Sequence, residues 1–334
     1  MRSQHYNIFR ERLADSAKVK QFPLQAMFEL TYECNFNCVY CYVPAQYREE
    51  SSQRQLNAKK IFFILDELSD LGCFYLGFTG GEVFLRKDIF DILWYAKRKG
   101  FNISIHTNAS LVDRKKAREL GRIVPSRLDV NINSLSKTNF DHITGARGFF
   151  NKTFSAIEYL RKNKIHLDFK TCYLNENKGE INSLKKFSAD YGGNLRICNL
   201  LMPSLSGTSF DGLKEHNSVS PLTSRHNGRL FSCGVGTNSL IISPFGTLKM
   251  CLHIDYPHFD ILETSLARCW QRLKKIIQDL KPDKNFKCNS CHLRQFCPWC
   301  PARSWAFNKT FTSCDPVCKS FAEEKYLKFQ SISQ

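Results

Sequence analysis

Short β-rich runs alternate with long amphipathic stretches between residues 24 and 200, and this alternation limits the fold more than any other feature. The β-rich runs cover residues 26–31, 74–79, 102–107, 128–132, 166–172 and 194–199, and helical patterns fill 57–72, 87–100 and 151–164. Strands that alternate with helices predict an α/β fold with a parallel sheet and helices outside it. Six such units favour an open, partial (β/α)6 barrel over a closed eightfold one.

The ends of the helical patterns carry their own signals. Asn57 precedes the first pattern as an N-cap, and Gly72 and Gly100 follow the first and second, where a left-handed residue ends a helix. In folds of this class the chemistry lies at the carboxyl ends of the strands. We therefore expect functional residues directly after the β-rich runs.

The alternating pattern stops near residue 202, and a segment rich in Ser, Gly and Pro follows it. Nine of the fifteen cysteines lie beyond this segment. We predict an N-terminal extension (1–23), the barrel (24–202), a linker (203–230), a small cysteine-rich domain (231–320) and a C-terminal tail (321–334).

The cysteines and the charge limit the class of protein. Fifteen cysteines in 334 residues are too sparse for a small disulfide scaffold. No apolar run approaches the roughly 18 residues of a membrane span, and no signal peptide is evident, so we expect a cytoplasmic protein with reduced thiols. Spaced cysteines then indicate metal ligands or redox groups. The net charge of +17 favours an acidic partner without identifying it.

Three of the cysteines, Cys34, Cys38 and Cys41, follow the first predicted strand in a C-x3-C-x2-C run. Three thiolates in one short loop can bind three corners of an iron–sulfur cubane, whereas zinc needs four protein ligands or three and water. The second strand ends in Gly80-Gly81-Glu82. Glycine permits a turn there with bare backbone groups beside a carboxylate, which could hold an ammonium group.

Together these motifs resemble the radical S-adenosylmethionine (SAM) superfamily. The resemblance implies that Cys34, Cys38 and Cys41 hold a [4Fe–4S] cluster whose fourth iron binds S-adenosylmethionine, and that reductive cleavage yields a 5′-deoxyadenosyl radical. It also implies cofactor contacts from residues at the strand ends. These are Tyr40, Gly80, Gly81, Glu82, Thr107, Asn108 and Asn131.

The C-terminal cysteines include two C-x2-C pairs, which by themselves could form a structural zinc site. Their layout, with four residues between Gly246 and Cys251, is similar to the SPASM domain. That resemblance implies one auxiliary [4Fe–4S] cluster on Cys233, Cys251 and Cys300, and a second on Cys288, Cys291, Cys297 and Cys318. The first would have an open iron or be completed by Cys314.

SPASM proteins mostly act on peptides, and this implies hydrogen abstraction from a ribosomally synthesised peptide, followed by crosslinking or another oxidation. An Asp that sulfatase-maturing relatives need after Cys251 is replaced by Leu252. Few residues precede the first motif, so we expect a separate precursor-recognition protein, and an electron donor such as flavodoxin or ferredoxin. A membrane is not expected as a partner, and nucleic acid is disfavoured.

Two other interpretations remain. One is a tetrapyrrole-modifying enzyme of the same superfamily, which would act in the haem pathway. The other is a basic zinc-binding nucleic-acid module with purely structural cysteines. Cys73, Cys172, Cys198 and Cys269 occur in apolar or helical runs, and we expect them in the core. His106 either faces the active site or packs within its strand.

Overall fold

The structure is a computed structural model that describes residues 2–206, 230–231, 233–282 and 286–332. In these residues nine strands form one sheet in the order β6-β5-β4-β3-β2-β1-β7-β8-β9. The strands are β1 (Gln25–Thr31), β2 (Tyr75–Gly80), β3 (Asn102–Thr107), β4 (Arg127–Asn131), β5 (Leu167–Cys172), β6 (Leu195–Cys198), β7 (Ser239–Ile242), β8 (Thr247–Cys251) and β9 (Ile254–Asp260). Strands β1–β6 are parallel, as predicted.

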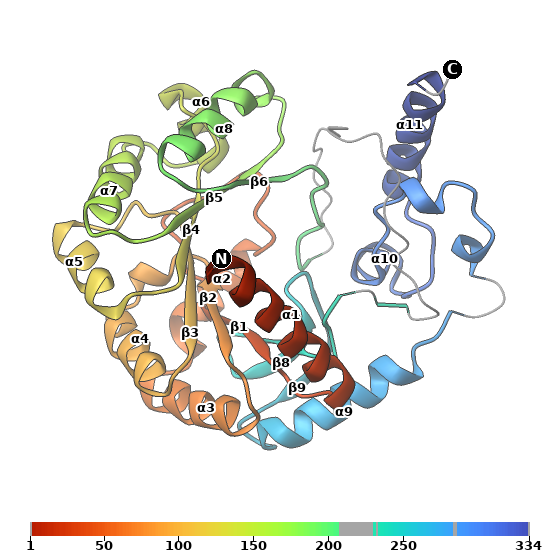
Figure 1. The fold of residues 1–334 in the computed structure, drawn as a ribbon, viewed down its shortest axis with the longest axis horizontal. Coiled ribbons are helices and arrows are strands. Elements are labelled where there is room, and N and C mark those ends of the chain that lie inside the picture. The colour runs from red at the N-terminus through yellow and green to blue at the C-terminus, as the bar shows by residue number, and fades with distance from the viewer. Residues whose placement is uncertain (1, 207–229, 232, 283–285, 333–334) are drawn as a thin grey trace.

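Helices surround the outer face of this curved sheet (Figure 1). They are α3 (Ala58–Asp70), α4 (Ile89–Arg98), α5 (Arg114–Ile123), α6 (Lys137–Thr144), α7 (Phe150–Lys162), α8 (Ile181–Asp190) and α9 (Leu266–Asp279). Apolar strand residues face these helices: Phe169 of β5 is fully buried, and its ring lies 5.4 Å from that of Phe187 in α8. Burial of such faces is the main stabilisation of the barrel. Helix α2 (Ala45–Arg54) lies instead beside the end of β1, where Ser51 Oγ accepts a hydrogen bond from the Tyr32 amide at 2.8 Å.

The predicted helix signals are confirmed. Asn57 caps α3 by accepting a hydrogen bond from the Lys60 amide at 3.0 Å. Gly72 and Gly100 both have φ of +85°, the left-handed conformation that ends α3 and α4.

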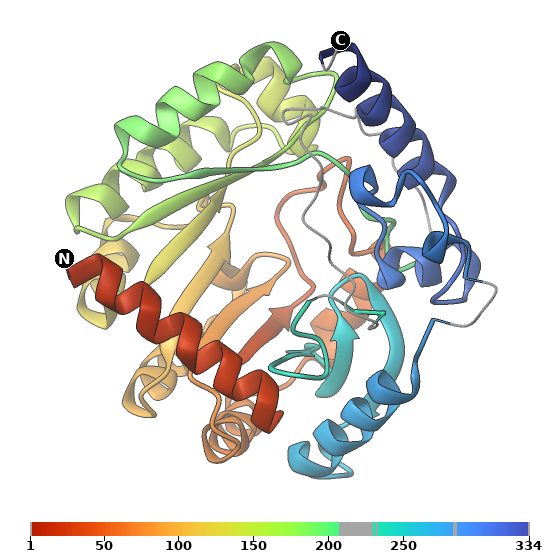
Figure 2. The ribbon, with the colours of Figure 1, turned by 45° about the vertical axis from the view of Figure 1, so that its right-hand side comes forward.

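Helix α1 (Arg2–Lys20) was not predicted. It crosses the amino ends of the strands (Figure 2), where Arg10 and Ala14 line a cavity of about 560 Å³ together with Gln25, Tyr75 and Asn102. The opposite, carboxyl edge of the sheet is left for the functional loops.

The sheet continues into the cysteine-rich region. Strand β7 pairs in parallel with β1, with Gln25 opposite Ser239, and β8 and β9 add two antiparallel strands. The helices α10 (Pro301–Asn308) and α11 (Pro316–Ile332) lie to one side of the barrel (Figure 2). The predicted domain boundaries stay a prediction, and most of the predicted linker lies outside the described residues. No helix among the described residues is long and apolar enough to cross a bilayer.

Candidate functional site

The loop between β1 and α2 carries the first three cysteines. The side chains of these three residues, Cys34, Cys38 and Cys41, are half-buried. Burial, with the charges of Glu82 and Cys41, raises the pKa of Cys34 to about 11, and burial with the charges of Cys41 and Cys34 raises that of Cys38. The three thiols therefore lie close together. Burial disfavours the negatively charged thiolate form of these cysteines. Because a thiol loses its proton when it binds a metal, bound iron would offset this negative charge.

Hydrogen bonds from neighbouring strand ends hold this loop in place. The Asn108 side-chain amide after β3 donates to Asn35 Oδ1 at 2.9 Å, and the Asn37 amide donates to the Thr144 carbonyl at 2.8 Å. Arg48 of α2 donates to the Phe36 carbonyl at 2.9 Å. The conformation between Cys34 and Cys38 is thus set by protein contacts.

Tyr40 and Asn131 were both predicted as cofactor contacts, and the structure brings them together. The Tyr40 hydroxyl accepts from Asn131 Nδ2 at 2.8 Å and donates to Asn133 Oδ1 at 2.8 Å. This arrangement fixes the ring beside the third cysteine, at the carboxyl end of β4. Their contact with the adenosyl group stays a prediction.

The glycines of the Gly80-Gly81-Glu82 motif are needed because two backbones approach closely. A Cβ on Gly80 would lie 2.0 Å from the Thr31 carbonyl oxygen, and one on Gly81 would lie 2.0 Å from that of Glu33. The Gly81 amide donates to the Thr31 carbonyl at 2.7 Å. The motif therefore joins the end of β2 to the strand that leads into the cysteine loop.

The Glu82 side chain points away from solvent. Its carboxylate is fully buried and accepts hydrogen bonds from the Thr107 hydroxyl at 2.8 Å and from the Asn108 amide at 2.7 Å. Burial raises its pKa. Glu82 thus holds the carboxyl ends of β2 and β3 together, and its binding of an ammonium group stays a prediction.

A layer of charged side chains lies inside the barrel, below these loops. His106 Nδ1 lies 2.6 Å from Lys170 Nζ, and His106 Nε2 lies 3.4 Å from Asp129 Oδ2. Arg196 forms an ion pair with the same Asp129. Burial lowers the pKa of His106 to about 3, so this imidazole is neutral, and burial lowers that of Lys170 to about 8. His106 therefore faces the barrel interior.

Two cysteines expected in the core line the barrel edge instead. Cys172 and Cys198 end β5 and β6 as register partners, Cys172 is half-buried and Cys198 is exposed. A hydrogen bond with Cys172 lowers the pKa of Cys198. The prediction that Cys172 and Cys198 lie in the core was wrong, because the last residue of a strand can be exposed even when the strand itself is apolar. Cys73 and Cys269 are buried, as predicted.

A second group of thiols lies beside the first. Burial, with the charges of Cys300 and Cys233, raises the pKa of Cys251 to about 12, and the grouping of these three cysteines around auxiliary cluster I stays a prediction. A buried ion pair links them to the first loop: Lys249 Nζ lies 2.9 Å from Glu29 Oε2, and the Tyr42 hydroxyl donates to Glu29 Oε1 at 2.6 Å.

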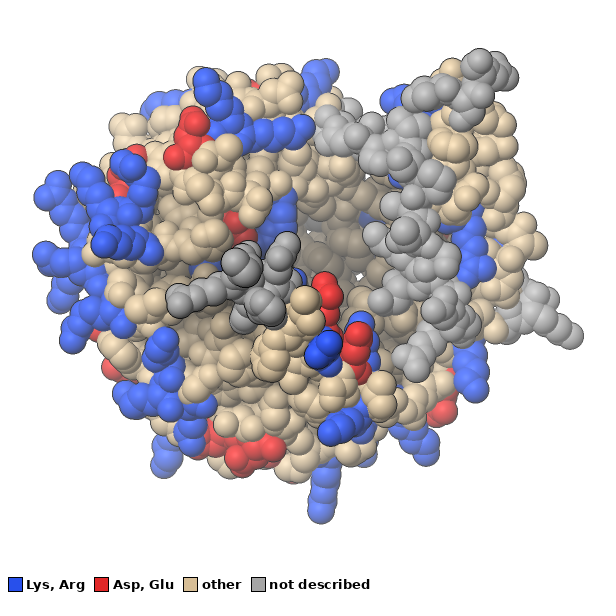
Figure 3. Space-filling view, viewed as in Figure 1, with Lys and Arg blue, Asp and Glu red and all other residues tan. Residues whose placement is uncertain are grey.

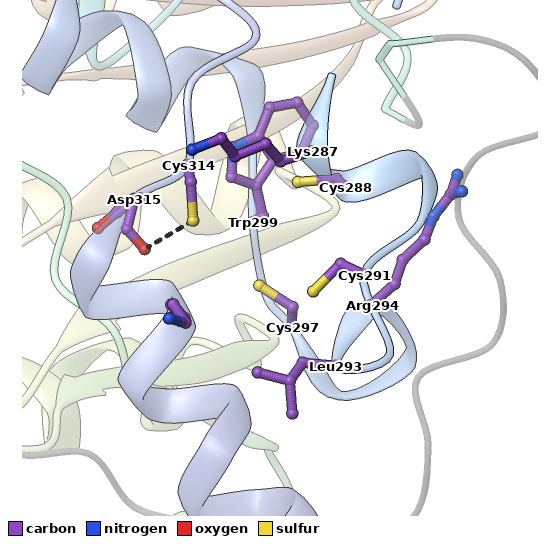
Figure 4. Close-up of a pocket in the computed structure, with 10 residues that line it drawn as sticks. Lys287, Cys288, Cys291, Leu293, Arg294, Cys297, Trp299, Cys314 and Asp315 are labelled. Atoms are coloured by element: carbon purple, nitrogen blue, oxygen red, sulfur yellow. Dashed lines mark hydrogen bonds between the residues drawn. The ribbon is translucent and has the colours of Figure 1, made fainter. Parts of the chain in front are cut away.

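A third group lines a cavity of about 440 Å³ in the C-terminal region (Figure 4). Its cysteines are Cys288, Cys291, Cys297 and Cys314. Cys288, Cys291 and Cys297 were predicted for auxiliary cluster II. The spacing favoured Cys318 as the fourth ligand of that cluster, but the fourth cysteine that lines this cavity is Cys314. Ligation by any of these residues stays a prediction.

Among the described residues, no three Cys, His, Asp or Glu side chains converge as ligands of a single metal ion.

Comparison with known proteins identifies the family. Residues 28–187 match the model of the radical SAM superfamily. These residues, which include strands β2–β5 of the barrel, form a radical SAM domain. The C-terminal region of the chain is of the SPASM type, and the protein is a radical SAM iron–sulfur enzyme that uses [4Fe–4S] clusters and S-adenosylmethionine.

Curated relatives of this radical SAM chain include proteins of different activity. An AdoMet-dependent heme synthase of Methanosarcina barkeri is 23% identical over 89% of this chain and 96% of its own length. The antilisterial bacteriocin subtilosin biosynthesis protein AlbA of Bacillus subtilis is 28% identical over 69% of this chain and 55% of its own. Mycofactocin maturase MftC of Mycolicibacterium smegmatis is 24% identical over 89% of this chain and 82% of its own length.

Among solved structures, Streptococcus suis SuiB bound to S-adenosylmethionine has a TM-score of 0.69 and 17% identity. The match covers 94% of this chain and 82% of that one, so the two share a fold over nearly the whole chain. The predicted fold class, a partial barrel followed by a cysteine-rich SPASM domain, is confirmed.

Proposed function

We propose that this radical SAM enzyme oxidatively modifies a ribosomally synthesised peptide. The observation that carries the proposal is the contact between two aromatic side chains that adjoin cysteines of the first and second thiol groups. Tyr42 directly follows Cys41, His253 follows Cys251 by two residues, and their rings lie 5.3 Å apart. A substrate held at the first group therefore lies next to a second candidate redox centre, which suits a reaction that removes electrons as well as hydrogen.

When bound, the cluster and S-adenosylmethionine supply a 5′-deoxyadenosyl radical that abstracts a hydrogen atom from the substrate. The chain itself would position the substrate in the barrel, beside Cys172 and Cys198. Burial lowers the pKa of Lys170 to about 8, so this side chain can exchange a proton there near neutral pH, and His106 Nδ1 lies 2.6 Å from its Nζ.

Peptide chemistry is supported by the relatives. SuiB has been solved bound to precursor peptide SuiA, and anSMEcpe, with 15% identity and a TM-score of 0.66, has been solved with AdoMet and a peptide. AlbA and MftC are named for bacteriocin biosynthesis and mycofactocin maturation. These similarities support a peptide as the substrate class.

Basic side chains provide a surface for an acidic leader. Lys and Arg gather on the outside of α5 and α7 (Figure 3), including the exposed Arg114, Lys115 and Arg118. Such a surface would attract an acidic segment while the core peptide enters the barrel. A separate recognition protein, a flavodoxin- or ferredoxin-type donor and a cytoplasmic location remain part of this proposal.

Tetrapyrrole modification is the second candidate, because the heme synthase of M. barkeri aligns over nearly the full length of both chains. The discriminating experiment incubates reconstituted enzyme, S-adenosylmethionine and dithionite with either a small peptide encoded beside the gene or iron coproporphyrin III. We expect 5′-deoxyadenosine and a peptide lighter by two hydrogen atoms. A changed porphyrin mass with an unchanged peptide would contradict the peptide assignment.

A further inference from the structure

The cavity in Figure 4 is bounded by thiols from two separate segments. Cys288, Cys291 and Cys297 come from the irregular segment before α10, and Cys314 comes from the segment before α11. The Cys297 and Cys314 sulfurs approach the cavity from different elements (Figure 4). Four cysteines around one cavity are a complete protein ligand set for a [4Fe–4S] cluster.

Cys318 does not line this cavity in the described chain, although the Cys297 thiol donates a hydrogen bond to the Cys318 carbonyl at 3.6 Å. The Cys318 side chain is fully buried, and its sulfur lies 3.3 Å from Asp315 Oδ2. This side chain therefore packs against Asp315.

Asp315 is itself fixed by several partners. Its Oδ1 accepts hydrogen bonds from the Val317 amide at 2.8 Å and the Cys318 amide at 3.3 Å, which makes it the N-cap of α11. It also forms a buried ion pair with Arg303 of α10, which donates to the Leu201 carbonyl. Because α11 begins at Pro316, Cys318 lies in its first turn facing the cap, and Cys314 lies in the segment before it.

We propose that Cys314, not Cys318, is the fourth thiolate of the auxiliary cluster held by Cys288, Cys291 and Cys297. Cys318 instead packs against Asp315 and joins α11 to the Asp315–Arg303 pair. The proposal depends on the iron–sulfur cofactor and is independent of whether the substrate is a peptide.

One consequence concerns the other auxiliary cluster. With Cys314 assigned to the Figure 4 cavity, only Cys233, Cys251 and Cys300 remain grouped beside the first loop. That cluster would then have one iron without a cysteine ligand, which could bind a donor atom of the substrate.

The first test compares Cys314→Ser with Cys318→Ser in the full chain after anaerobic reconstitution. Iron, sulfide and low-temperature electron paramagnetic resonance (EPR) spectra are measured, with circular dichroism to confirm folding. We expect Cys314→Ser to lose about four irons or to yield a [3Fe–4S] signal, and Cys318→Ser to keep all its iron, since serine preserves the hydrogen bond to Asp315. Loss of iron from folded Cys318→Ser, or an unchanged Cys314→Ser, would overturn the proposal.

The second test assigns Cys314 to one cluster by combination. The double variant that combines Cys291→Ser with Cys314→Ser should lose no more iron than the single variant Cys291→Ser, because both substitutions remove ligands of the same cluster. Cys300→Ser with Cys314→Ser should lose about four irons more than Cys300→Ser alone. The reverse pattern would place Cys314 on the cluster of Cys233 and Cys251. Neither test depends on a substrate.

Discussion

The first cysteine loop and the C-terminal cysteine region hold their thiols by different means. Residues 32–43 lie at the carboxyl edge of a parallel sheet, where Asn108 after β3 donates a hydrogen bond to Asn35 and the Thr144 carbonyl at the end of α6 accepts one from the Asn37 amide. In residues 286–300, the regular structure consists of two short 3-10 helices, Lys287–Asn289 and Arg294–Phe296, and Phe296 packs against Tyr326 and Phe329 of α11. The first site is thus tied to the sheet by backbone and side-chain hydrogen bonds, whereas the second has little regular secondary structure around its thiols.

The strongest test of this contrast removes the first site alone. Replacing Cys34, Cys38 and Cys41 together with Ala should abolish S-adenosylmethionine cleavage, because no thiolate is left to hold the cluster. The C-terminal cysteines lie on other elements and should keep their iron. Production of 5′-deoxyadenosine, measured by chromatography, would contradict the assignment if it persisted in this variant.

Metal removal should separate the two regions. Chelation of iron under anaerobic conditions is expected to raise amide hydrogen exchange in residues 286–300 by about tenfold or more, because metal binding there replaces missing packing. Strands β1–β4 should exchange as before. Equal acceleration in both regions, read by mass spectrometry, would show that the contrast is wrong.

A single methyl group should disturb the first site. Gly81→Ala places a Cβ against the Glu33 carbonyl, and we expect a loss of about 3 kcal/mol in the free energy of unfolding together with weaker S-adenosylmethionine binding. Gly179→Ala is the matched control, because nothing lies within 4 Å of its Cβ. Denaturant titration and equilibrium dialysis measure the two effects, and similar values for both variants would refute the close-approach argument.

The smallest expected effect comes from the Tyr40 hydroxyl. Tyr40→Phe leaves Asn131 and Asn133 without this partner, so we expect a roughly fivefold loss of S-adenosylmethionine affinity, about 1 kcal/mol, with iron content unchanged. Unaltered affinity, measured by the same dialysis, would mean that the ring orientation does not depend on these hydrogen bonds.

The parallel strands could be predicted because each carries a local β-rich run next to a helical pattern. Strand β7 could not, since its pairing of Ser239 with Gln25 joins distant segments and leaves no local signal. Helix α1 was missed because its polar sequence lacks a clear apolar stripe.

The site shows the same division. Motif spacing predicts the grouping of Cys233, Cys251 and Cys300, which stays a prediction. It favoured Cys318 over Cys314 because spacing does not show that α11 begins at Pro316 and turns Cys318 toward Asp315. The pairing of Cys172 with Cys198 at the strand ends depends on sheet register, which spacing alone does not reveal.

The central claim is that all three thiol groups hold iron–sulfur clusters. The most direct measurement is iron, sulfide and zinc content after strictly anaerobic purification and reconstitution. We predict about twelve irons per chain, matching sulfide and negligible zinc, for three [4Fe–4S] clusters. About four irons with one or two zinc ions would contradict the account and leave the C-terminal region a structural zinc module.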